Sequence, residues 1–243
     1  MKKKIVILAI FAVITATAVT SVLNRHKVFF YAGTVEATEV EISARLTGII
    51  GEVAVKEGDE VKKGDLLVYL SCEDIQVAAE STEKDYSRAK ILLKAGSMDQ
   101  GSFDKIKYRR DDTAVRLSWC SIVSPIDSTV ITRYHEPGEM VSPGLRLIEL
   151  ADLDRPWAYI YVPQPMLSKV SLGMKINGIV PESDMGNITG TIVKINNEAE
   201  FTPKNVQTRK ERTRLVFGIK VEFDNSGRSL KPGMTVEMSL PEG

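Results

Sequence analysis

Residues 42–70, ISARLTGIIGEVAVKEGDEVKKGDLLVYL, occur a second time in this chain. A shift of 80 positions lays them without a gap over residues 122–150, IVSPIDSTVITRYHEPGEMVSPGLRLIEL. Two copies are too few for a solenoid, which needs about three repeats to bury a continuous core. We therefore predict two half-domains that complete each other. The identical pairs are Ile42/Ile122, Gly58/Gly138, Val61/Val141, Gly64/Gly144, Leu67/Leu147 and Leu70/Leu150.

Each copy consists of short β-rich runs separated by turns. The turns fall at residues 56–59 and 62–65 in the first copy, and at 136–139 and 142–144 in the second. Glycine at such turns adopts positive φ without steric cost. Each copy should therefore form three or four short strands, with too little core to be stable alone.

The segment between the copies, residues 71–121, has a helical period instead. Apolar or small residues recur at spacings of four and three, which is a heptad pattern, and the two runs mirror each other about Gly96. We predict an antiparallel coiled-coil hairpin with Gly96 at its tip, loosely packed where Arg110 faces Thr82. The two seams are Ile75, Ala79, Thr82, Tyr86, Ala89, Leu93 and Phe103, Ile106, Arg110, Thr113, Leu117, Cys120.

Cys72 and Cys120, the two cysteines of the chain, fall on the same mirror. They should lie opposite each other at the base of the hairpin. In an exported protein such a pair favours a disulfide over a metal site. The alternative is two reduced cysteines in contact, and in either state their role is structural.

The C-terminal part, residues 153–243, returns to β patterns. Five strands with one short helical turn at 164–172 predict a small barrel. Residues 196–213 form a long loop that is basic in its second half, and we weigh a solvated loop equally against a partner contact. The predicted domains are residues 1–27 (signal or anchor), 28–71 (first half with a leading barrel strand), 72–120 (hairpin), 121–152 (second half) and 153–243 (barrel).

The N-terminus reads as a membrane-targeting segment. Three lysines follow Met1, and residues 5–23 carry no charge over nineteen positions. A basic start before an apolar run is typical of an export signal or a membrane anchor. We favour a retained inner-membrane span with a periplasmic domain. A cleaved signal, with Ala16-Thr17-Ala18 as the cleavage site, is the alternative.

Composition and motifs argue against enzymes and nucleic-acid binders. The formal net charge is +0, with 32 basic and 32 acidic residues, so there is no electrostatic footprint for nucleic acid. The histidines, His26 and His135, have no metal-site spacing, and no catalytic or phosphate-binding motif is present. We predict a protein without catalytic residues, metal or cofactor.

Residues 55–70, V-x-E-G-D-x-V-x-x-G-D-x-L-x-x-L, resemble half of a biotinyl/lipoyl carrier domain. A carrier needs an exposed lysine on a β-turn. The nearest match to its motif, residues 36–40, has Glu39 where that lysine would be. The resemblance therefore implies the fold of a carrier without its cofactor.

The whole arrangement resembles the periplasmic adaptors of bacterial efflux pumps, the membrane fusion protein or HlyD-like family. The motifs that carry the resemblance are residues 124–127, 136–144, 199–208 and 230–234. It implies a mainly β fold: a split lipoyl-like β-sandwich with an inserted α-helical hairpin, a C-terminal β-barrel and an N-terminal transmembrane helix. It also implies a homo-oligomeric ring that links an inner-membrane transporter to an outer-membrane channel.

The resemblance also implies two contact regions. At the hairpin tip, Arg88 and Leu92 match the family's channel-docking motif, whereas Asp99 stands where a serine or threonine is usual; Gly96 and Ser97 complete this region. The phrase at 201–208 looks most like adaptors of ABC transporters, and it suggests transporter contacts at Phe201, Lys204, Val206, Arg209 and Arg212.

Two other functions remain open. The chain could be an adaptor of a proton-driven pump, or a lipoyl-like domain of a periplasmic protein without a transport role. One departure from the family concerns the fold alone: Ser128 replaces a usual glycine and should tighten that turn.

Overall fold

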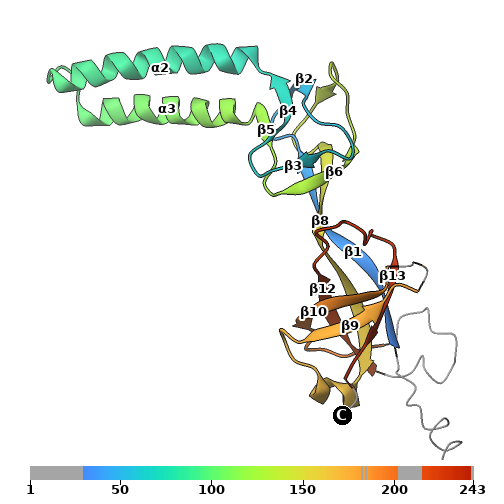
Figure 1. Cartoon of the computed structure of the whole chain (residues 1–243). Helices are drawn as coiled ribbons and strands as arrows, with labels where there is room; N and C mark the ends of the chain where they lie inside the picture. The colour runs from blue at the N-terminus through green and yellow to red at the C-terminus, as the bar shows by residue number, and fades with distance from the viewer. Residues whose placement is uncertain (1–29, 182, 184, 202–214, 242–243) are drawn as a thin grey trace, which may run out of the picture. The chain divides into compact units, whose positions relative to one another are not determined.

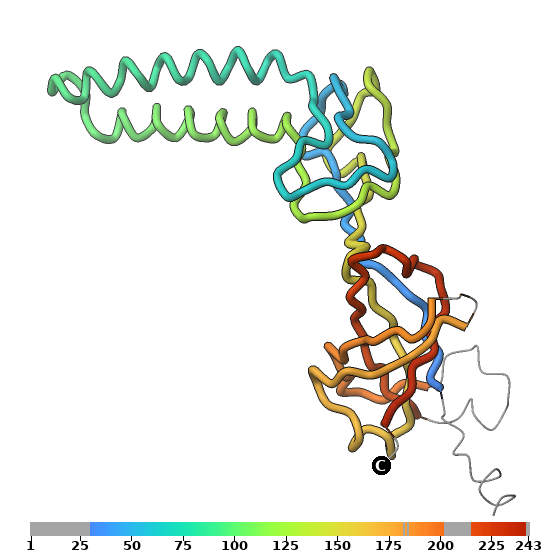
Figure 2. Tube along the Cα trace, viewed as in Figure 1, coloured from blue at the N-terminus to red at the C-terminus, as the bar shows by residue number. Residues whose placement is uncertain are grey.

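The computed structural model describes residues 30–181, 183, 185–201 and 215–241 (Figures 1 and 2). These residues fall into two compact units. The sandwich unit comprises residues 35–157 and 222–234, and the barrel unit takes the remaining described residues. The segment 153–243, predicted as one barrel domain, is thus divided between the two units.

The two repeats form one β-sandwich by exchanging strands. Strand β2 of the first repeat pairs antiparallel with β7 of the second, and β3 of the first pairs antiparallel with β6 of the second. The short strand of each repeat therefore pairs with a longer strand of the other repeat. β2 also pairs with β4, which pairs with β5. The prediction of two mutually completing halves is confirmed. The strands are β2 (Gly48–Val53), β3 (Glu60–Val61), β4 (Leu66–Ser71), β5 (Ser121–Val123), β6 (Ser128–Arg133) and β7 (Met140–Val141).

The turn glycines join the halves symmetrically. The backbone N–H of Gly58 donates to the carbonyl of Val130 at 2.8 Å, and that of Gly138 donates to the carbonyl of Ile50 at 2.7 Å. These two bonds are related by the 80-residue shift. Both glycines have positive φ, +90° and +94°, a conformation that side chains with a Cβ rarely adopt. The same turn chemistry therefore closes both halves.

One continuous apolar core fills the sandwich. Of the six identical repeat pairs, the four apolar pairs lie in this core and the two glycine pairs do not. Leu67, Leu147 and Leu70 are at most 1% exposed. Ser128 is 8% exposed and begins β6 with ordinary backbone geometry, and the predicted tightening of the turn before it stays a prediction. Its hydroxyl lies buried without a hydrogen-bond partner among the described residues.

The inserted segment folds as two helices that lie side by side, α2 (Glu73–Lys94) and α3 (Gln100–Ser118) (Figure 1). Every residue of the two predicted seams is buried or half-buried, whereas nearly all other helical positions are exposed. At the base, Cys72 and Cys120 are joined in a disulfide, one of the two states left open by the sequence.

The Arg110 side chain occupies the middle of the hairpin, where loose packing was predicted. Its guanidinium lies over the Tyr86 ring, 4.1 Å from the centroid, and it pairs with Glu83 on the same helix as Tyr86. The Tyr86 ring also contacts Phe103 at 5.5 Å. Only Ile75 and Ala89 of α2, and no residue of α3, are fully buried. The seam is therefore narrow and partly polar.

The barrel unit is a closed six-stranded barrel. Its strand order is β12-β10-β9-β13-β1-β8, and the β12–β8 pairing closes it. β8 crosses the predicted domain boundary at 152/153 and runs unbroken out of the second repeat. The short turn η1 (Gln164–Lys169) and strand β11 (Glu200–Phe201) complete the unit. The strands are β1 (Phe30–Ser43), β8 (Arg146–Pro163), β9 (Lys175–Ile179), β10 (Asn187–Ile195), β12 (Leu215–Phe223) and β13 (Thr235–Ser239).

None of the described helices is both long and apolar enough to cross a membrane. The predicted N-terminal anchor, residues 1–27, lies outside the described residues.

Candidate docking surfaces

The hairpin tip is a tight helix end built around Gly96. The N–H of Ser97 donates to the carbonyl of Leu92 at 2.9 Å, and the N–H of Gly96 donates to that of Leu93 at 3.1 Å. This pair of bonds is a Schellman motif, which requires a left-handed residue just past the helix. Gly96 has φ of +71° and fills that role. Gly96 and Ser97 are exposed in the turn between α2 and α3, and their role in docking stays a prediction.

Asp99 begins the second helix. Its carboxylate accepts a hydrogen bond from the backbone N–H of Ser102 at 2.9 Å, which is the N-cap geometry of α3. Hydrogen bonds from the side chain and backbone of Ser102 lower the pKa of Asp99. The side chain that departs from the family's docking motif is therefore used to start a helix.

Arg88 and Leu92 lie one turn apart and face the same groove. This tip groove has a volume of about 320 Å³ and is lined from both helices. Arg88 pairs with Asp85, also on its rim, and Leu92 is 44% exposed. Arg88 and Leu92 thus line the same groove, whereas Asp99 caps the N-terminus of α3. Six further residues line the groove. Thr82, Ala89 and Ile106 belong to the predicted seams, whereas Asp85, Met98 and Arg109 were not predicted to lie here.

The predicted transporter contacts are mostly outside the described residues. Phe201 lies on β11, where it pairs with Leu215 of β12, and its side chain is 74% exposed. Lys204, Val206, Arg209 and Arg212 lie in the segment 202–214, which the structure does not describe. Their role stays a prediction.

A second apolar surface was not anticipated. The outer face of the four-stranded sheet β5-β4-β2-β7 exposes five large apolar side chains. Ile49 and Met140 are register partners, as are Leu66 and Val123, and the Tyr69 ring lies beside Gly51. Because both faces of β4 are apolar, its sequence LLVYL carried this signal. We call Ile49, Leu66, Tyr69, Val123 and Met140 the outer sheet face.

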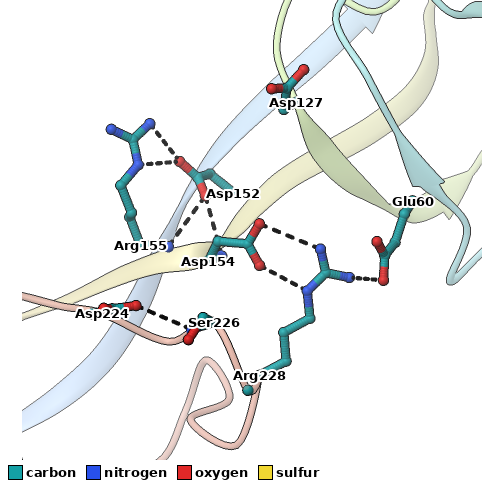
Figure 3. A pocket seen from close by; sticks show the side chains of 9 residues that line it. Glu60, Asp127, Asp152, Asp154, Arg155, Asp224, Ser226 and Arg228 are labelled. Atoms are coloured by element: carbon teal, nitrogen blue, oxygen red, sulfur yellow. Dashed lines mark hydrogen bonds and ion pairs between the residues drawn. The ribbon is translucent and has the colours of Figure 1, made fainter.

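A charged groove in the sandwich unit is built around Arg228 (Figure 3). The guanidinium donates to both carboxylate oxygens of Asp154, at 2.8 and 3.4 Å, and also pairs with Glu60. The bond from Arg228 lowers the pKa of Asp154. This clamp attaches the segment 222–234 to β3 and β8. Among the described residues, no cluster of histidine, cysteine and carboxylate side chains has the arrangement of a metal site.

Comparison with known sequences supports the sandwich assignment. Residues 38–152 match the family model described as CzcB-like, barrel-sandwich hybrid domain. A curated membrane protein of the UPF0194 group from Acidithiobacillus ferridurans is 41% identical over 135 residues, which cover 55% of this chain and 38% of that protein. The match thus spans little more than a third of the relative's length.

Comparison with solved structures covers more of the chain. A MacA-MexA chimera, containing the Pseudomonas aeruginosa MexA α-hairpin domain, gives a TM-score of 0.63 at 21% identity, covering 87% of this chain and 79% of that one. A membrane fusion protein of Streptococcus pneumoniae gives 0.59 at 20% identity, covering 88% and 99%. Residues 38–152 are thus similar to a CzcB-like barrel-sandwich hybrid domain, and the chain has a fold like that of the chimera and of the membrane fusion protein.

Proposed function

We propose that this chain is a periplasmic adaptor of an efflux or export system. It connects an inner-membrane transporter to an outer-membrane channel and has no catalytic role. Residues 1–27 attach it to the inner membrane, and the transporter is of the ABC type, as the resemblance at 201–208 implies.

One observation carries this proposal: a helical hairpin is inserted between the two halves of a self-completing sandwich. Its helices leave the sandwich between β4 and β5, and its tip contains no core residue. At 1.5 Å per residue, α2 alone extends about 33 Å. A rigid platform with such a rod suits a bridging role, because the platform holds the rod while the tip remains free for a partner.

The test is site-specific photo-crosslinking in living cells. Probes replace Ser97 at the tip and Val206 in the segment 202–214, and a control probe replaces Ser81, which is exposed near the base of the hairpin. We expect Ser97 to capture an outer-membrane channel, Val206 to capture a transporter subunit, and Ser81 to capture neither. Absence of any membrane partner from both test probes would refute the adaptor function.

The outer sheet face supports the ring that an adaptor of this kind implies. Contiguous apolar side chains that are exposed on one face often mark an interaction site. In a ring the contact is heterologous, so each copy offers two different surfaces. A Tyr69→Glu change should shift the particle mass from a ring to a monomer in native mass spectrometry, whereas Tyr108→Glu on the hairpin should not. A ring of unchanged size in Tyr69→Glu would exclude this face.

Export also accounts for the disulfide. Disulfides persist in oxidising compartments such as the periplasm. In protein taken from cells under acid quench, Cys72 and Cys120 should be alkylated only after reduction. Free thiols at both positions would argue against a periplasmic location.

A further inference from the structure

The hairpin carries opposite charges toward its two ends. The outer part, residues 83–109, holds seven basic and four acidic side chains, net +3. The base, residues 73–82 and 110–118, holds two basic and five acidic side chains, net −3. This asymmetry is not visible in the formal net charge of the whole chain, which is +0. A partner at the tip therefore meets a positive surface, which attracts acidic surfaces over several ångströms.

The tip groove lies within this positive part. Its floor is apolar: Ala89 is 1% exposed, and Met98 and Ile106 are half-buried. Its rim carries Arg88 from α2 and Arg109 from α3. The rim also carries Asp85, so it has one net positive charge.

The two rim arginines differ in their partners. Arg88 is already paired with Asp85. In the described part of the chain Arg109 makes no ion pair, and its backbone carbonyl accepts a hydrogen bond from the Thr113 hydroxyl. Arginine presents five donors in a planar fork that suits carboxylates. Arg109 is thus the cation at the groove that remains available to a partner.

We propose that the tip groove binds an acidic, apolar-tipped segment of the partner channel. An apolar side chain enters between Leu92, Met98 and Ile106, and a neighbouring carboxylate pairs with Arg109. This rests on the proposed adaptor function, and it names the chemistry of the partner and a residue that the docking motif does not contain. A lipid headgroup would satisfy Arg109 but would leave the apolar floor uncovered.

The experiment uses the full chain in cells, with a photo-crosslinking probe at Met98. Arg109→Glu reverses the available charge, and Arg109→Lys keeps it. The matched control is Arg116→Glu, an equal reversal on an exposed residue of the same helix but in the acidic base. We expect Arg109→Glu to lower capture of the channel about tenfold, Arg109→Lys to lower it less, and Arg116→Glu to leave it within about twofold. Circular dichroism checks that each variant remains helical.

Each other outcome overturns a defined part of the proposal. Capture that is equal in Arg109→Glu and in the unchanged chain would show that docking occurs without the acidic contact. Equal losses of capture in Arg109→Glu and Arg116→Glu would show that the effect depends on the overall charge of the hairpin and not on a contact at Arg109. Capture of lipid instead of protein would assign the groove to a membrane. No capture at Met98 or Ser97 in the unchanged chain would refute docking itself, and with it the bridging function.

Discussion

The sandwich and the hairpin, neighbours in one chain, are stabilised in different ways. The sandwich buries seventeen residues in one cluster, which includes both cysteines and Ile75 at the hairpin base. The helices beyond that base bury only Ala89 fully, and an arginine lies in their seam. The apolar core therefore holds the sandwich together, whereas most side chains of the hairpin remain accessible. Substitutions should therefore act globally in the sandwich and locally in the hairpin.

The largest effect is expected from truncating the repeat leucines. Leu67 and Leu147 occupy equivalent positions in the two repeats and are at most 1% exposed, so the changes to compare are Leu67→Ala and Leu147→Ala. Each substitution should destabilise the sandwich unit by about 2–5 kcal/mol. Removing a buried leucine side chain loses its favourable transfer free energy and leaves a cavity. Urea unfolding measures this cost. Costs that differ by more than about 1.5 kcal/mol would contradict the equivalence of the two halves.

A smaller, local effect is expected in the seam of the hairpin. Tyr86→Ala removes the ring that contacts both Phe103 and Arg110. The loss should be about 1–2 kcal/mol, seen as faster amide exchange in α2 and α3 with unchanged exchange in the sandwich. Tyr108→Ala is the control, since that ring is 73% exposed. Faster exchange throughout the sandwich would show that the two regions unfold together.

A gain in stability is expected when the buried hydroxyl of Ser128 in the second repeat is removed. Ser128→Ala removes a buried hydroxyl that has no partner in the described structure. The sandwich should become more stable by about 1 kcal/mol, because the desolvation cost of the hydroxyl disappears. Thermal unfolding would register the gain as a rise in Tm. A loss of stability would mean that the hydroxyl has a partner, such as an ordered water.

The smallest effect concerns pH at the start of α3. The folded pKa of Asp99 is lowered, so its contribution is present above its ordinary value of 3.8 and is lost as pH falls through the folded pKa. Amides of the first turn of α3 should therefore lose protection at acid pH. Asp99→Asn keeps a capping oxygen and should remove this pH dependence. Persistence of the pH dependence in Asp99→Asn would assign it to another group.

Much of this architecture was predictable because it follows from periodicity. The 80-residue shift predicted the paired halves, and the mirror about Gly96 predicted the seams and the meeting of Cys72 with Cys120. The continuity of β8 across the predicted domain boundary could not be predicted, since three of its four residues 152–155 are charged and yet the strand remains extended. Nor could the Arg228 clamp be found, because it joins segments 74 residues apart and Arg228 adopts positive φ without being glycine.

The docking surfaces were only partly predictable, for a related reason. Arg88 and Leu92 lie on one helix at a spacing that the sequence displays. Arg109 and Met98 join them only when the second helix folds back, so their proximity depends on the hairpin register. The outer sheet face needs two neighbouring strands to be in register, which no single strand reveals.

The most direct test of the adaptor function is the composition of the complex that the full chain forms in its own membrane. The tagged chain would be extracted in mild detergent after brief crosslinking and analysed by mass spectrometry. We predict several copies of the chain together with one inner-membrane transporter and one outer-membrane channel, with recovery of the channel strongly reduced in Arg109→Glu. Recovery of the chain alone, or with water-soluble proteins only, would contradict it.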